Sequence, residues 1–162
     1  MHPIRVDSIS SLLVHVSRQI HEFGWALIVT PYGDYLHHYT LGLPLRWRHQ
    51  DLETFALDEE RGSAYLTALV QRIQDGMRYR NGDFVSDLAA GYDLFLVENP
   101  CDPEGAPMTS GRLRLVWPDA HYRYPWHQGC ERRCAAQAFI PPPSDVELQH
   151  LHCQLGVLGA VN

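Results

Sequence analysis

The sequence predicts an α+β fold: a single domain with a mainly antiparallel sheet flanked by two main helices. Two segments carry apolar residues at helical spacing, and five short segments read as strands. They do not follow the regular strand–helix–strand order of a parallel sheet. Closure of the sheet into a barrel is an alternative that this pattern leaves open. The length of 162 residues suits one domain over residues 1–140, followed by a tail or short helix over residues 141–162.

The first half of the chain predicts one helix and three strands. The helix covers about residues 7–23, behind a cap at Asp7 or Ser8 and before Gly24. Residues 25–30 form a β-prone run, which the turn sequence Pro-Tyr-Gly-Asp closes. Two further strands follow at residues 36–43 and 52–57, joined by a link over residues 44–50.

The second half predicts another helix and two more strands. The helix begins near Asp58 and ends at Gly76. The strands cover residues 92–98 and 112–117, with a turn-rich loop over residues 101–111. In the last strand, Arg112 and Arg114 alternate with Leu113 and Leu115, as expected of a half-buried strand. A short helix from Ser144 is predicted in the tail.

Charge and composition exclude several partners. The formal net charge of −6 repels phosphate backbones and anionic lipids, so no nucleic acid or membrane partner is expected. The chain has no lysine, which excludes Schiff-base chemistry and a phosphate-loop lysine. The sequence shows no secretion signal and no membrane-spanning run, so we expect a cytoplasmic protein. In that compartment its four cysteines, Cys101, Cys130, Cys134 and Cys153, are expected as reduced thiols.

The segment from Leu113 to Cys130, LRLVWPDAHYRYPWHQGC, concentrates aromatic, histidine and proline residues. With the segment around Tyr39 to His49, it predicts a pocket of aromatic and arginine side chains that grips a ligand or a protein partner. The predicted pocket residues are Tyr39, Thr40, Arg46, Arg48, His49, Trp117, Asp119, Arg123 and Trp126. In the alternative interpretation, tryptophans and tyrosines fill the core and arginines stack on them at the surface.

Two chemical sites remain as hypotheses. Cys130 could act as a nucleophile, because Arg132 and Arg133 would favour its thiolate and His121 or His127 could serve as the base. The spacing of His127, Cys130 and Cys134 could instead hold a metal such as zinc. The alternative is that these cysteines and histidines are ordinary buried or surface side chains.

Several of these motifs together resemble a bacterial family, domain of unknown function 4262. They are Tyr-Thr-Leu-Gly-Leu at residues 39–43, the segment 46–52, the Gly91-Tyr92 pair, and the block 113–130. The resemblance covers about residues 24–130. The sequence departs from the family pattern at His37 and His38, at Gln50 and Asp51, and at His127. The strand order is also loosely similar to flavin-binding split barrels, which is an analogy of fold alone.

Known catalytic signatures are absent from the sequence, including a phosphate-binding glycine loop, a Gly-x-Ser-x-Gly elbow and a His-Glu-x-x-His motif. We therefore predict a small domain that binds a ligand or protein partner, in an accessory or immunity-like role. An enzyme that uses flavin, or Cys130 with a nearby histidine, is the alternative, and a protein with a His/Cys metal site is the third.

Overall fold

The computed structural model describes residues 2–5, 9–98 and 111–138 of the chain. The chain divides into two compact units, Met1–Arg78 and Tyr79–Asn162. Both units combine helices with mainly antiparallel strands, so the predicted α+β class is confirmed. The predicted tail over residues 141–162 and the loop over residues 101–110 lie outside the described residues, as does the helix from Ser144.

The first unit contains a sheet in the order β1-β2-β3-β4. β2 (Ala26–Tyr32) and β3 (Tyr35–Leu41) form an antiparallel hairpin in which Gly33 supplies a positive φ of 58° at the turn. β4 (Leu52–Phe55) pairs antiparallel with β3, and the short β1 (Ile4–Arg5) pairs parallel with β2. The three predicted strands of this half are thus present, and β1 was not predicted.

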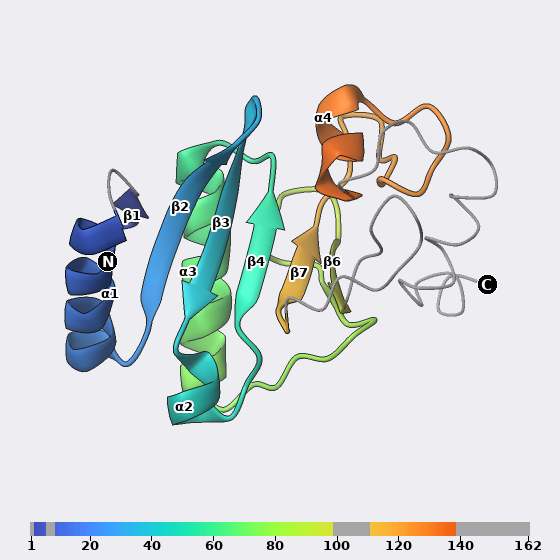
Figure 1. Ribbon diagram of the computed structural model, residues 1–162. Coiled ribbons are helices and arrows are strands. Elements are labelled where there is room, and N and C mark those ends of the chain that lie inside the picture. The colour runs from blue at the N-terminus through green and yellow to red at the C-terminus, as the bar shows by residue number, and fades with distance from the viewer. Residues whose placement is uncertain (1, 6–8, 99–110, 139–162) are drawn as a thin grey trace. The chain divides into compact units, whose positions relative to one another are not determined.

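Three helices accompany this sheet: α1 (Ile9–Phe23), α2 (Leu43–Trp47) and α3 (Glu59–Gln74). α3 lies behind β2, β3 and β4 in the view of Figure 1. It begins as predicted, because the Asp58 carboxylate accepts the backbone N–H of Arg61 at 2.8 Å and caps the helix. Its apolar stripe is buried and consists of Leu66, Leu69, Val70 and Ile73.

The second unit contains a three-stranded antiparallel arrangement in the order β7-β6-β5. β6 (Leu94–Glu98) and β7 (Leu113–Val116) are the two predicted strands, each shorter than expected, and β5 (Phe84–Val85) was not predicted. After β7, the chain forms a long irregular loop and then α4 (Arg132–Ala135) and the 3₁₀ turn η1 (Ala136–Ala138). Neither of these two short helices was predicted.

The barrel alternative and one expectation about a strand residue are wrong. Within the described residues neither unit closes into a barrel, because β1 and β4 stand at opposite ends of one strand order and β7 and β5 at opposite ends of the other. Arg114 does not alternate outward, since it is 2% exposed and its Nη1 donates to the backbone oxygen of Gln137 at 2.7 Å. A backbone acceptor satisfies this guanidinium nitrogen inside the protein, which a period-two pattern cannot reveal.

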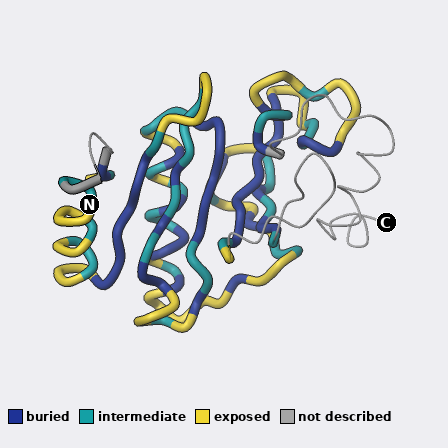
Figure 2. The backbone as a smooth tube through the Cα atoms, viewed as in Figure 1, coloured by how far each residue is buried: buried dark blue, intermediate teal, exposed yellow. Residues whose placement is uncertain are grey.

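The strands β4 and β7 and the first half of β2 are buried and dark in Figure 2, whereas α1 is exposed to solvent along one side. Leu13 and Val14 of α1 are 62% and 60% exposed. Among the described residues, no helix is both long and apolar enough to cross a lipid bilayer.

Candidate functional site

The loop between β7 and α4, residues 117–131, is organised by one buried carboxylate, that of Asp119. Its Oδ1 accepts the backbone N–H groups of His121 and Arg123 at 2.8 and 3.0 Å. Its Oδ2 accepts the backbone N–H of Glu131 and the Arg123 Nε, both at 3.0 Å. Four donors therefore converge on one side chain and fix both ends of the loop.

The electrostatics of Asp119 reflect these donors. Burial alone would raise its pKa, but the backbone N–H groups of Arg123, Glu131 and His121, together with the Arg123 guanidinium, lower the pKa to about 2. The carboxylate is thus ionised across the whole physiological range. Its role is to hold the loop in one conformation.

The tip of this loop is a tight turn in a strained conformation. The Tyr122 N–H donates to the Asp119 carbonyl at 3.0 Å, and the Asp119 N–H donates to the Arg123 carbonyl at 2.8 Å. Tyr122 adopts a φ of 61°, a left-handed conformation that is uncommon for residues other than glycine. Its side chain is nonetheless 62% exposed, so packing inside the protein does not explain why a tyrosine stands there.

An aromatic cluster connects the loop to β6. Tyr124 and Trp126 stack with ring centroids 4.9 Å apart and an angle of 3°, and Phe95 of β6 meets both rings edge-on. Trp126 is 4% exposed and packs with Val97 and Val116. The Tyr124 hydroxyl donates to the Asp93 carbonyl at 2.8 Å, and burial raises the pKa of this phenol to about 12. These rings form one hydrophobic cluster of the second unit.

The segment after the loop is tied to the end of β7 by Gln137, which is 1% exposed. The Gln137 Oε1 accepts the Trp117 N–H at 2.9 Å, and its Nε2 donates to the Trp117 carbonyl at 2.6 Å. A side-chain amide thus pairs with one residue of the backbone as a neighbouring strand would. The predicted pocket residue Trp117 is itself 8% exposed.

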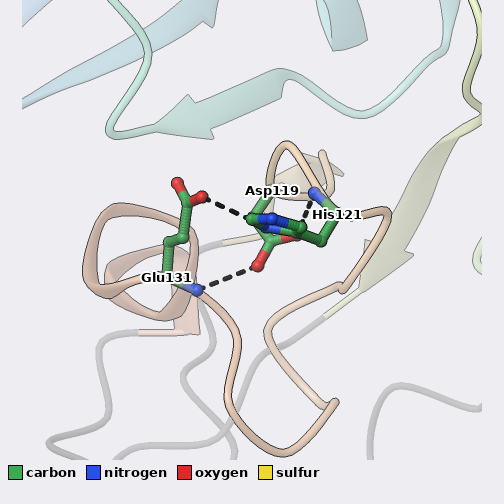
Figure 3. Close-up of side chains that lie close together, drawn as sticks. All are labelled: Asp119, His121 and Glu131. Atoms are coloured by element: carbon green, nitrogen blue, oxygen red, sulfur yellow. Dashed lines mark hydrogen bonds and ion pairs between the residues drawn. The ribbon is translucent and has the colours of Figure 1, made fainter.

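Asp119, His121 and Glu131 form a three-residue group of potential metal ligands, drawn in Figure 3. Their ligand atoms lie within 4.8 Å of one another. The four donors already occupy the lone pairs of Asp119, and the Arg123 Nη2 lies 3.2 Å from the His121 Nδ1. A cation would have to displace backbone N–H groups beside a guanidinium, so the geometry does not suit a metal.

The predicted thiol and metal residues are close in sequence but differ in environment. The His127 Nδ1 accepts the backbone N–H of Tyr124 at 3.0 Å, which leaves this nitrogen engaged in a turn. Cys130 and Cys134 are unbridged thiols, and the buried Cys134 Sγ lies 3.2 Å from the Arg123 carbonyl. Burial raises the pKa of both thiols, which opposes formation of a thiolate nucleophile.

The remaining predicted pocket residues lie in the first unit and have separate roles. Thr40 is fully buried. Its hydroxyl donates a hydrogen bond to the Asp51 carboxylate at 3.0 Å and accepts one from the Leu52 N–H at 2.8 Å. His49 is 4% exposed, and its Nδ1 lies 2.7 Å from the Gln50 carbonyl. Arg46 and Arg48 are exposed, and Tyr39 is half-buried on β3.

The sequence comparison decides which family the chain represents. A model of the family described as domain of unknown function (DUF4262) matches residues 19–131, which is more than half of the chain. The chain belongs to this family. The resemblance that the motifs indicated over residues 24–130 is thereby confirmed. No curated protein and no solved structure matches the chain.

The structure of this DUF4262 domain also reveals residues that sequence reasoning missed. Asp51 accepts the backbone N–H groups of Gly42 and Leu43 and so holds the start of α2. His37 lies 3.1 Å from the buried Glu53 and stacks on Phe55 at 3.9 Å. His37 and Glu53 are 16 residues apart in sequence, and the pairing of β3 with β4 brings them together.

Proposed function

We propose that this DUF4262 domain recognises a protein partner through the loop of residues 117–131, with Tyr122 as the anchoring side chain. The observation that carries the proposal is the combination of strain and exposure at Tyr122. A non-glycine residue in the left-handed region costs about 1–3 kcal/mol and persists where the surrounding structure enforces it. Tyrosine is enriched among the residues that dominate protein interfaces.

The surroundings of Tyr122 support a preorganised binding surface. Asp119 fixes the backbone on both sides, so little conformational entropy is left to lose on binding. His121, Arg123 and Glu131 form a polar rim with exposed side-chain fractions of 69%, 37% and 51%. The net charge of −6 favours a basic partner by long-range attraction, as in an accessory or immunity-like role.

Replacement of Tyr122 by glycine tests the proposal because it removes the ring and relieves the strain. We expect Tyr122→Gly to leave the free energy of unfolding unchanged or raise it by about 1 kcal/mol, since glycine adopts this φ without steric cost. Partner binding should fall at least about tenfold, the loss of roughly 1.4 kcal/mol expected for an anchoring aromatic residue.

The matched control is Tyr32→Ala, which removes a tyrosine of similar exposure, 54%, at the end of β2. Tagged wild-type and variant chains are expressed in the native host, and co-purified proteins are quantified by isotope-labelled mass spectrometry. A partner retained by wild type and Tyr32→Ala but lost by Tyr122→Gly supports the loop. Equal retention by all three chains contradicts it.

A further inference from the structure

His38 is a buried histidine whose ring has no polar partner. It lies on β3 and is fully buried. Among the described residues, neither its Nδ1 nor its Nε2 forms a hydrogen bond. Buried imidazole nitrogens normally find partners, so this side chain needs an explanation.

The ring packs directly against α3. A Cβ atom placed on Gly62 would lie 2.5–2.6 Å from three atoms of the His38 ring, so only glycine leaves room for this contact. On the neighbouring strands, the residues opposite His38 are Val29 of β2 and Thr54 of β4, and neither carries a charge. The ring is therefore enclosed between uncharged strand residues and the backbone of a helix.

The charged groups near His38 come from α3 and from its own strand. Burial is the main influence and lowers the pKa of His38. The Glu59 backbone raises the pKa of His38, although it does not reach hydrogen-bond geometry. The charge of His37 lowers this pKa further, and the carboxylates of Glu59 and Asp58 raise it. Asp58 is already engaged, because it caps α3 through the Arg61 N–H.

We propose that His38 makes the attachment of α3 to the sheet sensitive to acid, so that protonation of this ring loosens the helix and exposes its apolar underside. The physical basis is that an imidazolium in this position would be a buried cation to which no described residue offers an acceptor in hydrogen-bond geometry. The side chains uncovered would be Leu66, Leu69, Val70 and Ile73. This inference concerns the first unit and does not depend on the proposed role of Tyr122.

The direction of the pH effect follows from linkage. A histidine with a lowered pKa in the folded protein is neutral in both states above about pH 6.5, where it has no pH-dependent effect. As the pH falls below that value, the open form binds the proton first and is favoured. The stability of the closed form is therefore fully present at neutral pH and is lost in acid.

Hydrogen exchange of the α3 amides, measured on the full chain, tests this switch. After correction for intrinsic exchange, opening of residues 66–73 should increase between roughly pH 7.5 and pH 5. The limit is about thirtyfold, because pH 5 lies about 1.5 units below the ordinary histidine pKa of 6.5 and each unit corresponds to a factor of ten. His38→Leu should remove most of this increase while retaining His37. His15→Asn, which removes an exposed histidine of α1, should leave the increase intact.

A second measurement covers the case in which His38→Leu does not fold. The carbon chemical shifts of the His38 ring in the wild-type protein report its protonation directly. A ring that stays neutral down to about pH 5 in the closed form supports the switch. The inference is overturned if His38 titrates near its ordinary pKa while exchange of α3 is unchanged, or if His38→Leu keeps the full pH dependence.

Discussion

The Asp119 carboxylate holds the fifteen-residue loop of the second unit in one conformation, because it accepts the backbone N–H groups of residues 121, 123 and 131. Asp119→Asn retains the shape of the side chain but replaces one acceptor oxygen by a donor. At least one N–H donor would then face an amide nitrogen. Hydrogen bonds to charged groups contribute about 1.5–3 kcal/mol, so we expect a loss of roughly 2–4 kcal/mol at neutral pH.

The pH dependence distinguishes this effect from general damage. Because the pKa of Asp119 is lowered to about 2, its stabilisation is present above the ordinary value of 3.8 and is lost as the pH falls towards 2. Denaturant titrations should therefore show the difference between wild type and Asp119→Asn shrinking below about pH 4. Asp34→Asn, in the exposed hairpin turn, is the control and should change stability by less than about 0.5 kcal/mol.

Individual residue types were predictable, but their environments were not. Asp119 and Trp126 were both predicted as pocket residues, yet Asp119 accepts hydrogen bonds from the loop backbone and Trp126 lies in a buried cluster. Both tryptophans of the segment are nearly inaccessible, as the core-filling interpretation expects. The strain at Tyr122 has no sequence signal, because a positive φ at tyrosine is imposed by the hydrogen bonds around it.

At the scale of elements, the attachment of η1 to β7 depends on Gln137. Gln137→Leu has nearly the same volume but leaves the N–H and carbonyl of Trp117 without these partners. We expect a loss of roughly 1–3 kcal/mol, because two buried backbone groups each lose a hydrogen bond while the Trp117 carbonyl still accepts from the Cys134 thiol. The exposed Gln128→Leu should change stability by less than about 0.5 kcal/mol in the same thermal or denaturant assay. Equal effects of the two variants would contradict the role assigned to Gln137.

The contact between α3 and β3 yields a second prediction at this scale. Gly62→Ala should destabilise the protein by about 1–3 kcal/mol through overpacking, even though alanine is the better helix former. Combining it with His38→Ala should relieve the clash, so the double variant would be more stable than the sum of the two single effects. A double-mutant cycle measures this coupling, and additive effects would show that the two residues do not compete for space.

The two long helices were predictable, whereas the short helices and the two-residue strands were not. α1 and α3 contain enough periodic apolar residues to reveal their faces, and Asp58 marks a start. α2 and α4 have five and four residues, too few for periodicity to appear. Pro44 in the first turn of α2 was the one available signal. The two-residue strands β1 and β5 exist only through their pairing with β2 and β6.

At the scale of the whole molecule, the negative net charge gives a simple test. With a formal charge of −6 at pH 7 and an isoelectric point near 5.9, the chain should not bind DNA at neutral pH and physiological salt. Fluorescence anisotropy of a labelled duplex should show no binding at protein concentrations of about 100 μM. Proteins that bind DNA non-specifically typically have dissociation constants of about 1–100 μM, so this concentration would detect them. Saturable binding under these conditions would contradict the expected class of partner.

The fold class followed from the order of helices and strands, whereas the site depended on tertiary contacts. Sequence reasoning grouped Tyr39 to His49 with the later aromatic segment, and the first of these groups contains structural residues such as Thr40 as well as exposed arginines. Chain order cannot separate these roles, because each depends on which backbone groups lie nearby after folding.

The β2–β3 hairpin gives the histidine dipeptide at residues 37 and 38 an unusual sensitivity to insertions and deletions. Adjacent strand residues point to opposite faces, so His37 meets the acidic Glu53 while His38 meets the α3 backbone at Gly62. A single residue added to or removed from the Gly33-Asp34 turn could shift the register by one and exchange the two rings. Relatives that keep both histidines should therefore preserve the length of this turn even where its residues vary.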